Sequence, residues 1–389
     1  NSRLMAALHG GVLRWCSVLG SWLRWDGRRW ATTRGDEVAH ERACTLGTVY
    51  YQEATRVREM VKAEASEEGK KSLTDRADRL LAWGRRCESA STIRAAAVLY
   101  RAQPEAQLDS ECLDADLCAL NVRNGILDLR TGQLTPHRPD AWLTKLVPVD
   151  YRPDAGAPRW ARFLEEVMPD PATQTYVQRA LGYCLTGDVR EQVWFFAFGD
   201  GANGKSVLLD TVCALLGDYA CSVNPDTFRA ANHSQPNNYQ LAGLRGIRMV
   251  LAQEMDEDTP IAEGLLKSVT GSRTVSARVP YGMYFDMPVT FKAWVAGNHR
   301  PTIRGSDLGM WRRVRVVPFD VTIPEADRDT DLLCKLRQEY PGILAWLVRG
   351  CLDWQRHGLI VPPTMKAAAD DYRQSQDLVR PFLADCCNL

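Results

Sequence analysis

Residues 199–206 have the sequence GDGANGKS, which places a lysine and a serine after a glycine-rich stretch in the spacing G-x-x-x-x-G-K-[ST]. Glycine backbone allows several N–H groups to turn inward together around a chain of phosphates. Lys205 can then bring its ammonium to the β- and γ-phosphates, and the hydroxyl of Ser206 can bind Mg²⁺. The spacing therefore predicts a site for a nucleoside triphosphate, with a glycine-rich structural turn as the alternative.

The segments on either side of this stretch favour the nucleotide site. Residues 193–198 form an unbroken apolar and aromatic run, typical of a strand buried on both faces of a parallel sheet. From Val207 onward a helix is predicted, and its N-terminus adds the positive end of a dipole. ATP and Mg²⁺ are the predicted cofactors. The predicted nucleotide-binding residues are Gly199, Asp200, Gly201, Ala202, Asn203, Gly204, Lys205, Ser206 and Val207.

Polar side chains follow two further apolar runs, and both could act on a bound triphosphate. The run 247–252 is followed by Gln253 and Glu254. A carboxylate at a strand end can hold Mg²⁺, usually through water, or orient the attacking water, and Glu254 is the candidate. The run 289–296 leads to Asn298, whose amide can sense the γ-phosphate without a charge that competes for the metal. An ordinary acidic loop is the alternative for Glu254.

Two adjacent arginines, Arg312 and Arg313, precede the apolar run 314–317. An arginine at this edge of an ATPase core can reach the γ-phosphate of a neighbouring subunit and stabilise the charge of the transition state. One of the two is expected to be this arginine finger, and the other a structural or sensing partner.

The N-terminal region contains short strand-like segments and then helices. The dipeptide Asp26-Gly27 predicts a two-residue hairpin turn. The surrounding tryptophans and arginines could stack on bases, but packing of the tryptophans on neighbouring helices is the favoured interpretation. Apolar spacing predicts helices over 36–66, 73–88 and 91–101, with a charged break at 67–71. The tryptophans are Trp15, Trp22, Trp25 and Trp30.

A change in character near Pro104 separates this helical region from the rest. A hairpin over 121–134 and several prolines follow, and amphipathic helices over 160–168 and 173–186 then lead into the run 193–198. The predicted division is an α-rich collar or oligomerisation domain over 1–120, a hairpin and Pro-rich linker over 121–155, an ATPase core over 156–330 and a C-terminal helical segment over 331–389.

The composition limits the class of protein. With 45% hydrophobic and 25% charged residues, the 389-residue chain resembles ordinary soluble globular proteins. No apolar run approaches the roughly 18 residues of a membrane span, and no signal peptide is evident, so we expect a cytoplasmic location. The 12 cysteines include no C-x-x-C pair, which favours free thiols over a zinc site. Zero net charge argues against a wholly basic surface but permits a positively charged channel.

With these motifs in order, the chain resembles the superfamily three helicases of the phage and plasmid primase-helicase family, which are related to the poxvirus-type primase-helicases. GDGANGKS, IRMVLAQE and WVAGNHRP are similar to the family's Walker A, Walker B and sensor-one segments, and LGMWRRVRVVPF is similar to its arginine-finger segment. LLKSVTGSRTVSARVPYGMYFDM resembles its intermediate motif and the hairpin that faces DNA in the central channel. WLRWDGRRW and NVRNGILDLRTG resemble the region that precedes the helicase domain.

This resemblance implies an α/β protein with an AAA+-type P-loop parallel-sheet core and an α-rich N-terminal domain. It implies a hexameric, ring-forming DNA helicase of a phage or mobile element in a bacterial host cell, which moves 3′ to 5′ on single-stranded or forked DNA. A primase domain, fused or separate, is an expected partner, and the chain is expected to be a helicase fragment.

The resemblance also assigns roles to residues. Lys205 and Ser206 would bind ATP and Mg²⁺, Glu254 would activate water, and Asn298 would sense the γ-phosphate. Arg313 is the first candidate for the finger and Arg312 the second. The candidates for DNA contact, each of which could instead serve packing, are Lys267, Arg273, Arg278, Tyr281, Met283 and Tyr284.

Two departures from the family pattern and two other functions stay open. Gln253 stands where many P-loop ATPases carry a second acid, and the hairpin lacks an obvious Lys-His pair at its tip. A P-loop ATPase that loads or remodels replication proteins would keep the ATP residues but give no role to residues 278–284. A nucleotide-gated DNA-binding scaffold would use ATP only for assembly.

Overall fold

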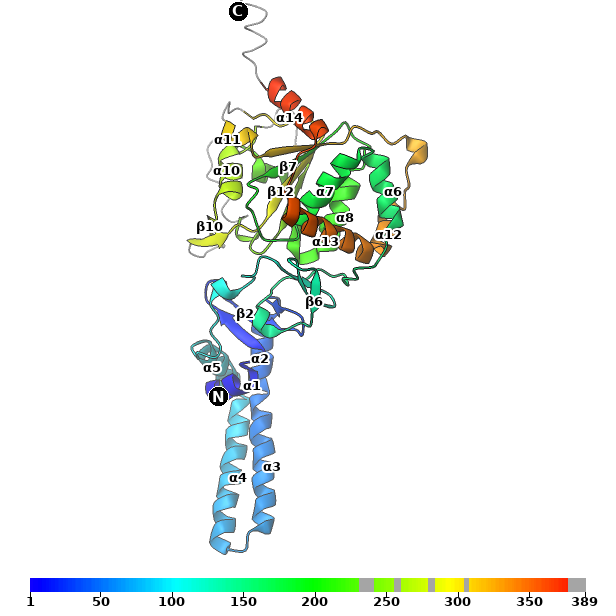
Figure 1. Cartoon of the computed structure of the whole chain (residues 1–389). Helices are drawn as coiled ribbons and strands as arrows, with labels where there is room; N and C mark the ends of the chain where they lie inside the picture. The colour runs from blue at the N-terminus through cyan, green and yellow to red at the C-terminus, as the bar shows by residue number, and fades with distance from the viewer. Residues whose placement is uncertain (231–240, 255–259, 279–283, 304–307, 377–389) are drawn as a thin grey trace, which may run out of the picture. The chain divides into compact units, whose positions relative to one another are not determined.

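The computed structural model describes residues 1–230, 241–254, 260–278, 284–303 and 308–376 (Figure 1). The chain divides into two compact units, one of residues 1–115 with 138–144 and the other of residues 116–137 with 145–389. We call them the first and second unit. None of the helices in the described ranges combines the length and apolar composition that a membrane span needs. The predicted domain limits stay a prediction.

The first unit combines a small antiparallel sheet with helices. The sheet has the order β1-β2-β3, and the turn between β2 and β3 centres on Gly27 and Arg28, one residue later than predicted. The N–H of Asp26 donates to the carbonyl of Arg29 at 3.0 Å, and Gly27 takes the left-handed φ of 95°. The elements of this unit are α1 (Ser2–His9), β1 (Leu13–Cys16), β2 (Ser21–Trp25), β3 (Trp30–Ala31), α2 (Gly35–Cys44), α3 (Leu46–Ala63), α4 (Glu67–Cys87), α5 (Ala90–Arg101), η1 (Ser110–Cys112) and η2 (Pro139–Ala141).

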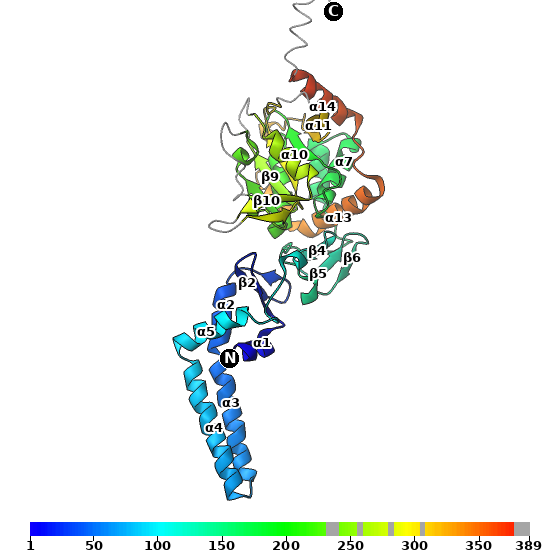
Figure 2. The same ribbon diagram turned by 90° about the vertical axis from the view of Figure 1, so that its left-hand side faces the viewer.

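The helices α3 and α4 lie side by side in both views (Figure 2), and their limits correct the sequence prediction. The helix predicted over 36–66 is interrupted at Thr45, whose hydroxyl donates to the carbonyl of Arg42 at 2.8 Å. The charged stretch predicted as a break is the first turn of α4. The hydroxyl of Ser66 accepts from the N–H of Gly69 at 3.3 Å, and acidic residues follow at the positive end of the helix dipole.

Two of the four tryptophans near the predicted turn, Trp22 and Trp30, pack inside the first unit, whereas Trp15 and Trp25 are half-buried. Trp22 and Trp30 are each 1% exposed. Trp22 stacks on Tyr100 with ring centroids 5.1 Å apart, and Trp30 stacks on Trp142 at 4.9 Å. These contacts support the packing interpretation, because a buried ring cannot serve as a platform for bases.

The second unit is built on a parallel sheet of five strands with the order β13-β7-β12-β9-β8. In chain order this is 5-1-4-3-2, so the strand before the glycine-rich loop lies between two others. The sheet strands are β7 (Trp194–Phe198), β8 (Ala220–Val223), β9 (Met249–Gln253), β12 (Lys292–Gly297) and β13 (Val314–Pro318). The α/β fold with a parallel sheet and a helical N-terminal region is confirmed.

Helices cover both faces of this sheet (Figure 1). Phe195 of β7 belongs to the core shared with α7, α8 and α13, while Phe196 belongs to the core that receives Leu266 of α10 and Tyr372 of α14. Such two-sided burial explains why the strands are continuous apolar runs. The helical elements are α6 (Pro158–Val167), α7 (Pro171–Tyr183), α8 (Lys205–Leu216), η3 (Gly217–Tyr219), η4 (Pro225–Phe228), α10 (Glu263–Gly271), α11 (Leu308–Trp311), η5 (Glu325–Asp327), α12 (Leu332–Gln338), α13 (Tyr340–His357) and α14 (Pro363–Ser375).

Two smaller antiparallel sheets complete the second unit. The predicted hairpin over 121–134 forms part of the sheet β4-β5-β6, and β10 pairs with β11. The helices α6 and α7 begin two residues before their predicted starts, because Pro158 and Pro171 occupy the first helical turn. The strands are β4 (Ala119–Val122), β5 (Gly125–Asp128), β6 (Gln133–Thr135), β10 (Thr274–Arg278) and β11 (Tyr284–Pro288).

Candidate functional site

The carboxyl ends of the central strands meet at one edge of the parallel sheet. Phe198 of β7 lies beside Gly297 of β12 and Pro318 of β13, and Gln253 of β9 pairs with Ala296. In open α/β sheets, ligands bind outside this edge. The residues that follow these strands are therefore the ones to examine for chemistry.

The glycine-rich loop after β7 has the backbone that phosphate binding needs. Gly201 and Gly204 have φ values of 102° and 83°, which favour glycine. Gly204 caps the N-terminus of α8, and a Cβ there would lie 2.5 Å from Cγ1 of Val167. The loop thus opens into the positive end of a helix, as the sequence predicted.

Lys205 is a buried cation surrounded by uncharged oxygens. It is 6% exposed, and its Nζ donates to the Gly199 carbonyl at 2.5 Å and to Oδ1 of both Asn203 and Asn298 at 3.1 Å. Burial lowers the pKa of Lys205, although the charge of Asp200 acts in the opposite direction. A buried charge is stable only when it is paired or well hydrogen-bonded. The partners recorded here are neutral, which leaves this ammonium suited to an anionic ligand such as phosphate.

Asn298 and Glu254 both follow strands that end at this edge. The amide nitrogen of Asn298 is 4.0 Å from the position of a Cβ on Gly201, so the amide points toward the loop. Glu254 has the left-handed φ of 63°, its N–H donates to the Ala296 carbonyl at 3.1 Å, and its side chain is exposed. The structure therefore brings Asn298 into contact with Lys205. Glu254 follows β9, which lies on the other side of β12 from β7.

Asp210 is a carboxylate that the sequence analysis missed. It lies one turn after Ser206 on α8, and its Oδ1 accepts from Nε2 of Gln253 at 2.7 Å. The i, i+4 spacing places Asp210 and the exposed Ser206 on one helix face and was the available sequence signal. Gln253 stands where many P-loop ATPases carry a second acid, and here it contacts the carboxylate of Asp210 on α8.

The donor set at this edge fits Mg²⁺. The hydroxyl of Ser206 and the carboxylates of Asp210 and Glu254 are hard oxygen ligands, which Mg²⁺ prefers. Within the described ranges, no three His, Cys, Asp or Glu side chains gather into a metal site of their own. A Mg²⁺ ion bound here would thus take most of its ligands from phosphate and water.

The two candidate finger arginines lie at the amino end of β13, at the opposite end of the parallel strands from the glycine-rich loop. The Arg313 carbonyl accepts from Trp194 at the start of β7, so β13 separates both arginines from the loop by roughly 15 Å. Arg313 is partly buried, and its Nη1 donates to the Gly309 carbonyl at 2.5 Å. The side chain of Arg312 is exposed. Neither arginine is brought to the loop of its own chain.

The predicted DNA hairpin is present as β10 and β11. Arg278 pairs with Tyr284 across the strands, its guanidinium lies 5.2 Å from the Tyr284 ring centre, and Tyr284 is 55% exposed. Arg273 is exposed just before β10, whereas Lys267 lies on α10 with its Nζ 3.7 Å from Oε2 of Glu263. Tyr281 and Met283 lie outside the described residues.

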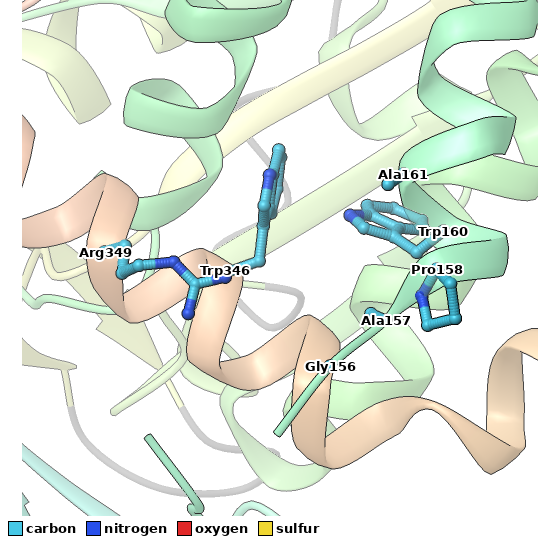
Figure 3. A pocket seen from close by; sticks show the side chains of 7 residues that line it. All are labelled: Gly156, Ala157, Pro158, Trp160, Ala161, Trp346 and Arg349. Atoms are coloured by element: carbon cyan, nitrogen blue, oxygen red, sulfur yellow. The ribbon is translucent and has the colours of Figure 1, made fainter. Parts of the chain in front are cut away.

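A separate pocket of about 340 Å³ lies between the start of α6 and α13 (Figure 3). Trp160 and Trp346 face each other edge to face, with ring centroids 5.5 Å apart. Arg349 is the charged residue of the lining, which also includes Gly156, Ala157, Pro158 and Ala161. This pocket shares no residue with the glycine-rich loop.

Comparison with known proteins shows which families and proteins the chain is similar to. Residues 2–169 match the family described as D5 N terminal like. The chain is 28% identical over 299 residues to "Putative helicase L207/L206" of Acanthamoeba polyphaga mimivirus, covering 70% of this chain and 31% of that protein. It is 30% identical over 245 residues to "Putative helicase 022R" of Frog virus 3, covering 57% and 25%. "Putative primase C962R" of African swine fever virus, isolate Tick/Malawi/Lil 20-1/1983, is 24% identical over 231 residues, covering 57% and 24%.

The apo structure of the NrS-1 C terminal region matches with a TM-score of 0.45 and 15% identity, covering 58% of this chain and 53% of that one. The chain carries a D5 N-terminal-like region and is similar to viral proteins named as helicases or primases, which confirms the predicted resemblance to primase-helicases. It spans less than a third of the length of these curated relatives.

Proposed function

We propose that the chain is the motor part of a replicative DNA helicase that assembles as a ring, expected to be a hexamer, and hydrolyses ATP with Mg²⁺. The observation that carries the proposal is Lys205, a buried ammonium with neutral partners inside a phosphate-type loop, in contact with Asn298 of the neighbouring strand. The strand order 5-1-4-3-2 supports an AAA+-type core, in which the loop strand lies between the sensor strand and the last strand.

In the proposed mechanism, the carboxyl edge of the sheet supplies one half of the catalytic site. Lys205 turns its ammonium to the β- and γ-phosphates, and Asn298 directs its amide N–H to the γ-phosphate. Glu254 orients the attacking water and accepts its proton. Ser206 would hold Mg²⁺, and the bound ion would supply positive charge that offsets the charge on the leaving group.

The other half of the site would come from a neighbouring subunit. The arginines lie at the amino end of β13, far from the loop of their own chain, which supports a role toward the nucleotide of another subunit. Arg313 is occupied by the Gly309 carbonyl and Arg312 is exposed, which supports Arg312 as the finger and Arg313 as its structural partner. The resemblance gave Arg313 as the first candidate for the finger and Arg312 as the second, so this proposal reverses that order.

Single-stranded DNA is the proposed track. Arg278 and Tyr284 offer a cation and an exposed aromatic ring at the end of the described part of the β10–β11 hairpin. Such pairs track backbone and bases without sequence preference. We further propose that the motor works beside a primase activity, fused or separate, in the cytoplasm of the host cell.

The test is steady-state ATP hydrolysis with and without single-stranded DNA, with Lys205→Ala as the blank. We expect strong stimulation by DNA that falls at least tenfold in Arg278→Ala and Tyr284→Ala, and that falls with rising salt. Arg162→Ala, which removes an exposed arginine on α6, is the matched control and should keep the stimulation.

The other outcomes separate the alternatives. Hydrolysis that ignores DNA would replace the helicase with an ATPase that loads or remodels proteins. ATP-dependent assembly without hydrolysis would indicate a scaffold. If ATP does not bind at all, the nucleotide site itself is wrong.

A further inference from the structure

We infer that Asn203 is a positioning residue: it holds the ammonium of Lys205 in place for phosphate and joins that ammonium to the end of β13. The inference rests on the proposed ATP site. It assigns Asn203 a role beyond lining the loop, because its side chain contacts Lys205 and β13 at the same time.

The amide of Asn203 uses both of its ends. Its Oδ1 accepts from Nζ of Lys205 at 3.1 Å and from the backbone N–H of Lys205 at 3.4 Å. Its Nδ2 donates to the Phe319 carbonyl at 3.1 Å. Asn203 is 3% exposed, so water cannot easily replace these bonds. An amide can supply an acceptor and a donor together, whereas a carboxylate supplies acceptors alone.

Holding the ammonium in advance should strengthen phosphate binding. A lysine side chain loses rotamer entropy when it is fixed in one geometry. Because Asn203 and the Gly199 carbonyl fix Lys205 before any ligand arrives, part of that cost falls on folding rather than on binding. The neutral charge of Asn203 matters as well, since an acid at this position would pair with the ammonium and offset its attraction for phosphate.

The Phe319 carbonyl is itself fixed to the loop region. The N–H of Phe319 donates to the Phe198 carbonyl at 2.8 Å, and the N–H of Ile323 donates to the Ala202 carbonyl at 2.8 Å. β13 therefore carries the Asn203 contact at its carboxyl end and the proposed finger, Arg312, at its amino end. The position of Lys205 in one subunit and of the arginine offered to the next subunit depend on the same strand.

A double-mutant cycle tests the inference, with binding of fluorescent ATP and Mg²⁺ as the measurement. Asn203→Ala should weaken ATP binding about tenfold, because the loss of preorganisation corresponds to about 1.4 kcal/mol. In the Lys205→Ala background the same change should have no further effect, because Asn203 acts through that ammonium. Additive losses would overturn the inference and assign Asn203 to loop structure alone.

Two further measurements keep the test decisive. AMP lacks the phosphates that Lys205 would contact, so its binding should be the same in Asn203→Ala as in the wild type; equal losses for AMP and ATP would contradict the inference. Asn203→Asp retains an acceptor and should still weaken ATP binding. Asn224→Ala, which removes another capping amide in the second unit, is the control for folding and should bind ATP normally. Failure of the wild type to bind ATP would instead contradict the proposed function.

Discussion

Two buried lysines lie at opposite ends of the parallel strands, and the groups that surround their ammonium nitrogens differ in kind. Lys292, at the start of β12, is 2% exposed. Its Nζ contacts the backbone carbonyls of Thr186, Asp188 and Thr290, the latter two at 3.3 and 3.4 Å, and lies 4.6 Å from the Tyr183 ring centre. Lys205, at the carboxyl edge, contacts one backbone carbonyl and two side-chain amides.

The difference separates a cation fixed by backbone carbonyls from one that we propose binds phosphate. The carbonyls around Lys292 belong to the backbone, so they cannot turn away without moving the chain. Next to Lys292, the buried guanidinium of Arg248 donates to the Leu185 and Ala119 carbonyls and so links this group of contacts to β4. The exposed Asn298 amide can rotate about its side-chain bonds and leave its place on the ammonium to a ligand, while Asn203 keeps the ammonium in position. Mutations at the two lysines should therefore have opposite signatures.

The largest effect is expected for Lys205→Ala on ATP hydrolysis. Removing the charge that we propose stabilises the transferred phosphoryl group should lower kcat by roughly 1,000-fold. The free energy of unfolding, measured by urea denaturation, should change by less than about 1 kcal/mol, because Asn298 is exposed to water and Oδ1 of Asn203 keeps its bond from the backbone N–H of residue 205. A large loss of stability together with the loss of activity would contradict the distinction between the two lysines.

Lys292→Met should show the reverse signature. Three backbone carbonyls would lose their buried donor, so the free energy of unfolding should fall by about 4 kcal/mol. ATP hydrolysis per folded molecule should stay within about twofold of the wild type. Lys335→Met, which removes an exposed lysine paired with Asp329, is the matched control and should cost less than about 1 kcal/mol. A Lys292→Met protein as stable as the wild type would contradict the structural role of Lys292.

The pH dependence of stability is a finer test of Lys292. Burial lowers the pKa of Lys292 from its ordinary value of 10.5 to about 8. Between these values the unfolded chain keeps a proton that the folded chain has released, so the free energy of unfolding should rise with pH, by up to about 3 kcal/mol. The comparison is urea denaturation of the wild type and Lys292→Met at pH 7.5 to 10.5. Parallel curves would mean that Lys292 stays fully charged in the fold.

The contrast also marks what could be predicted from sequence. The glycine-rich loop and the strand before it follow from local rules, because glycine spacing and an unbroken apolar run each have a physical meaning within a few residues. The start of α4 did not follow, because the N-cap at Ser66 outweighed the glycine and the charges after it. In both cases the deciding interactions are local, but at the start of α4 the N-cap signal of Ser66 competed with the contrary signal of Gly69.

Contacts between distant residues could not be predicted. Gln253 and Asp210 are 43 residues apart, and their hydrogen bond depends on how β9 and α8 are placed. A lysine such as Lys292 suggests a surface position from its type alone. Its burial depends on the carbonyls of Thr186 and Asp188, more than 100 residues earlier in the chain. Long-range packing thus decides which polar residues of the apolar runs become structural.

Asn298→Ala removes one of the two side-chain amides that contact Lys205, and it should have a smaller effect on activity than Lys205→Ala. Lys205 would keep its contacts with Gly199 and Asn203, so the free energy of unfolding should fall by only about 1 kcal/mol. Hydrolysis should fall roughly 100-fold, because no amide would then direct an N–H toward the γ-phosphate. Urea denaturation and steady-state kinetics on one preparation give both values. A loss of stability as large as that of Lys292→Met, with activity preserved, would mean that Asn298 braces the loop and that both edges of the sheet are structural.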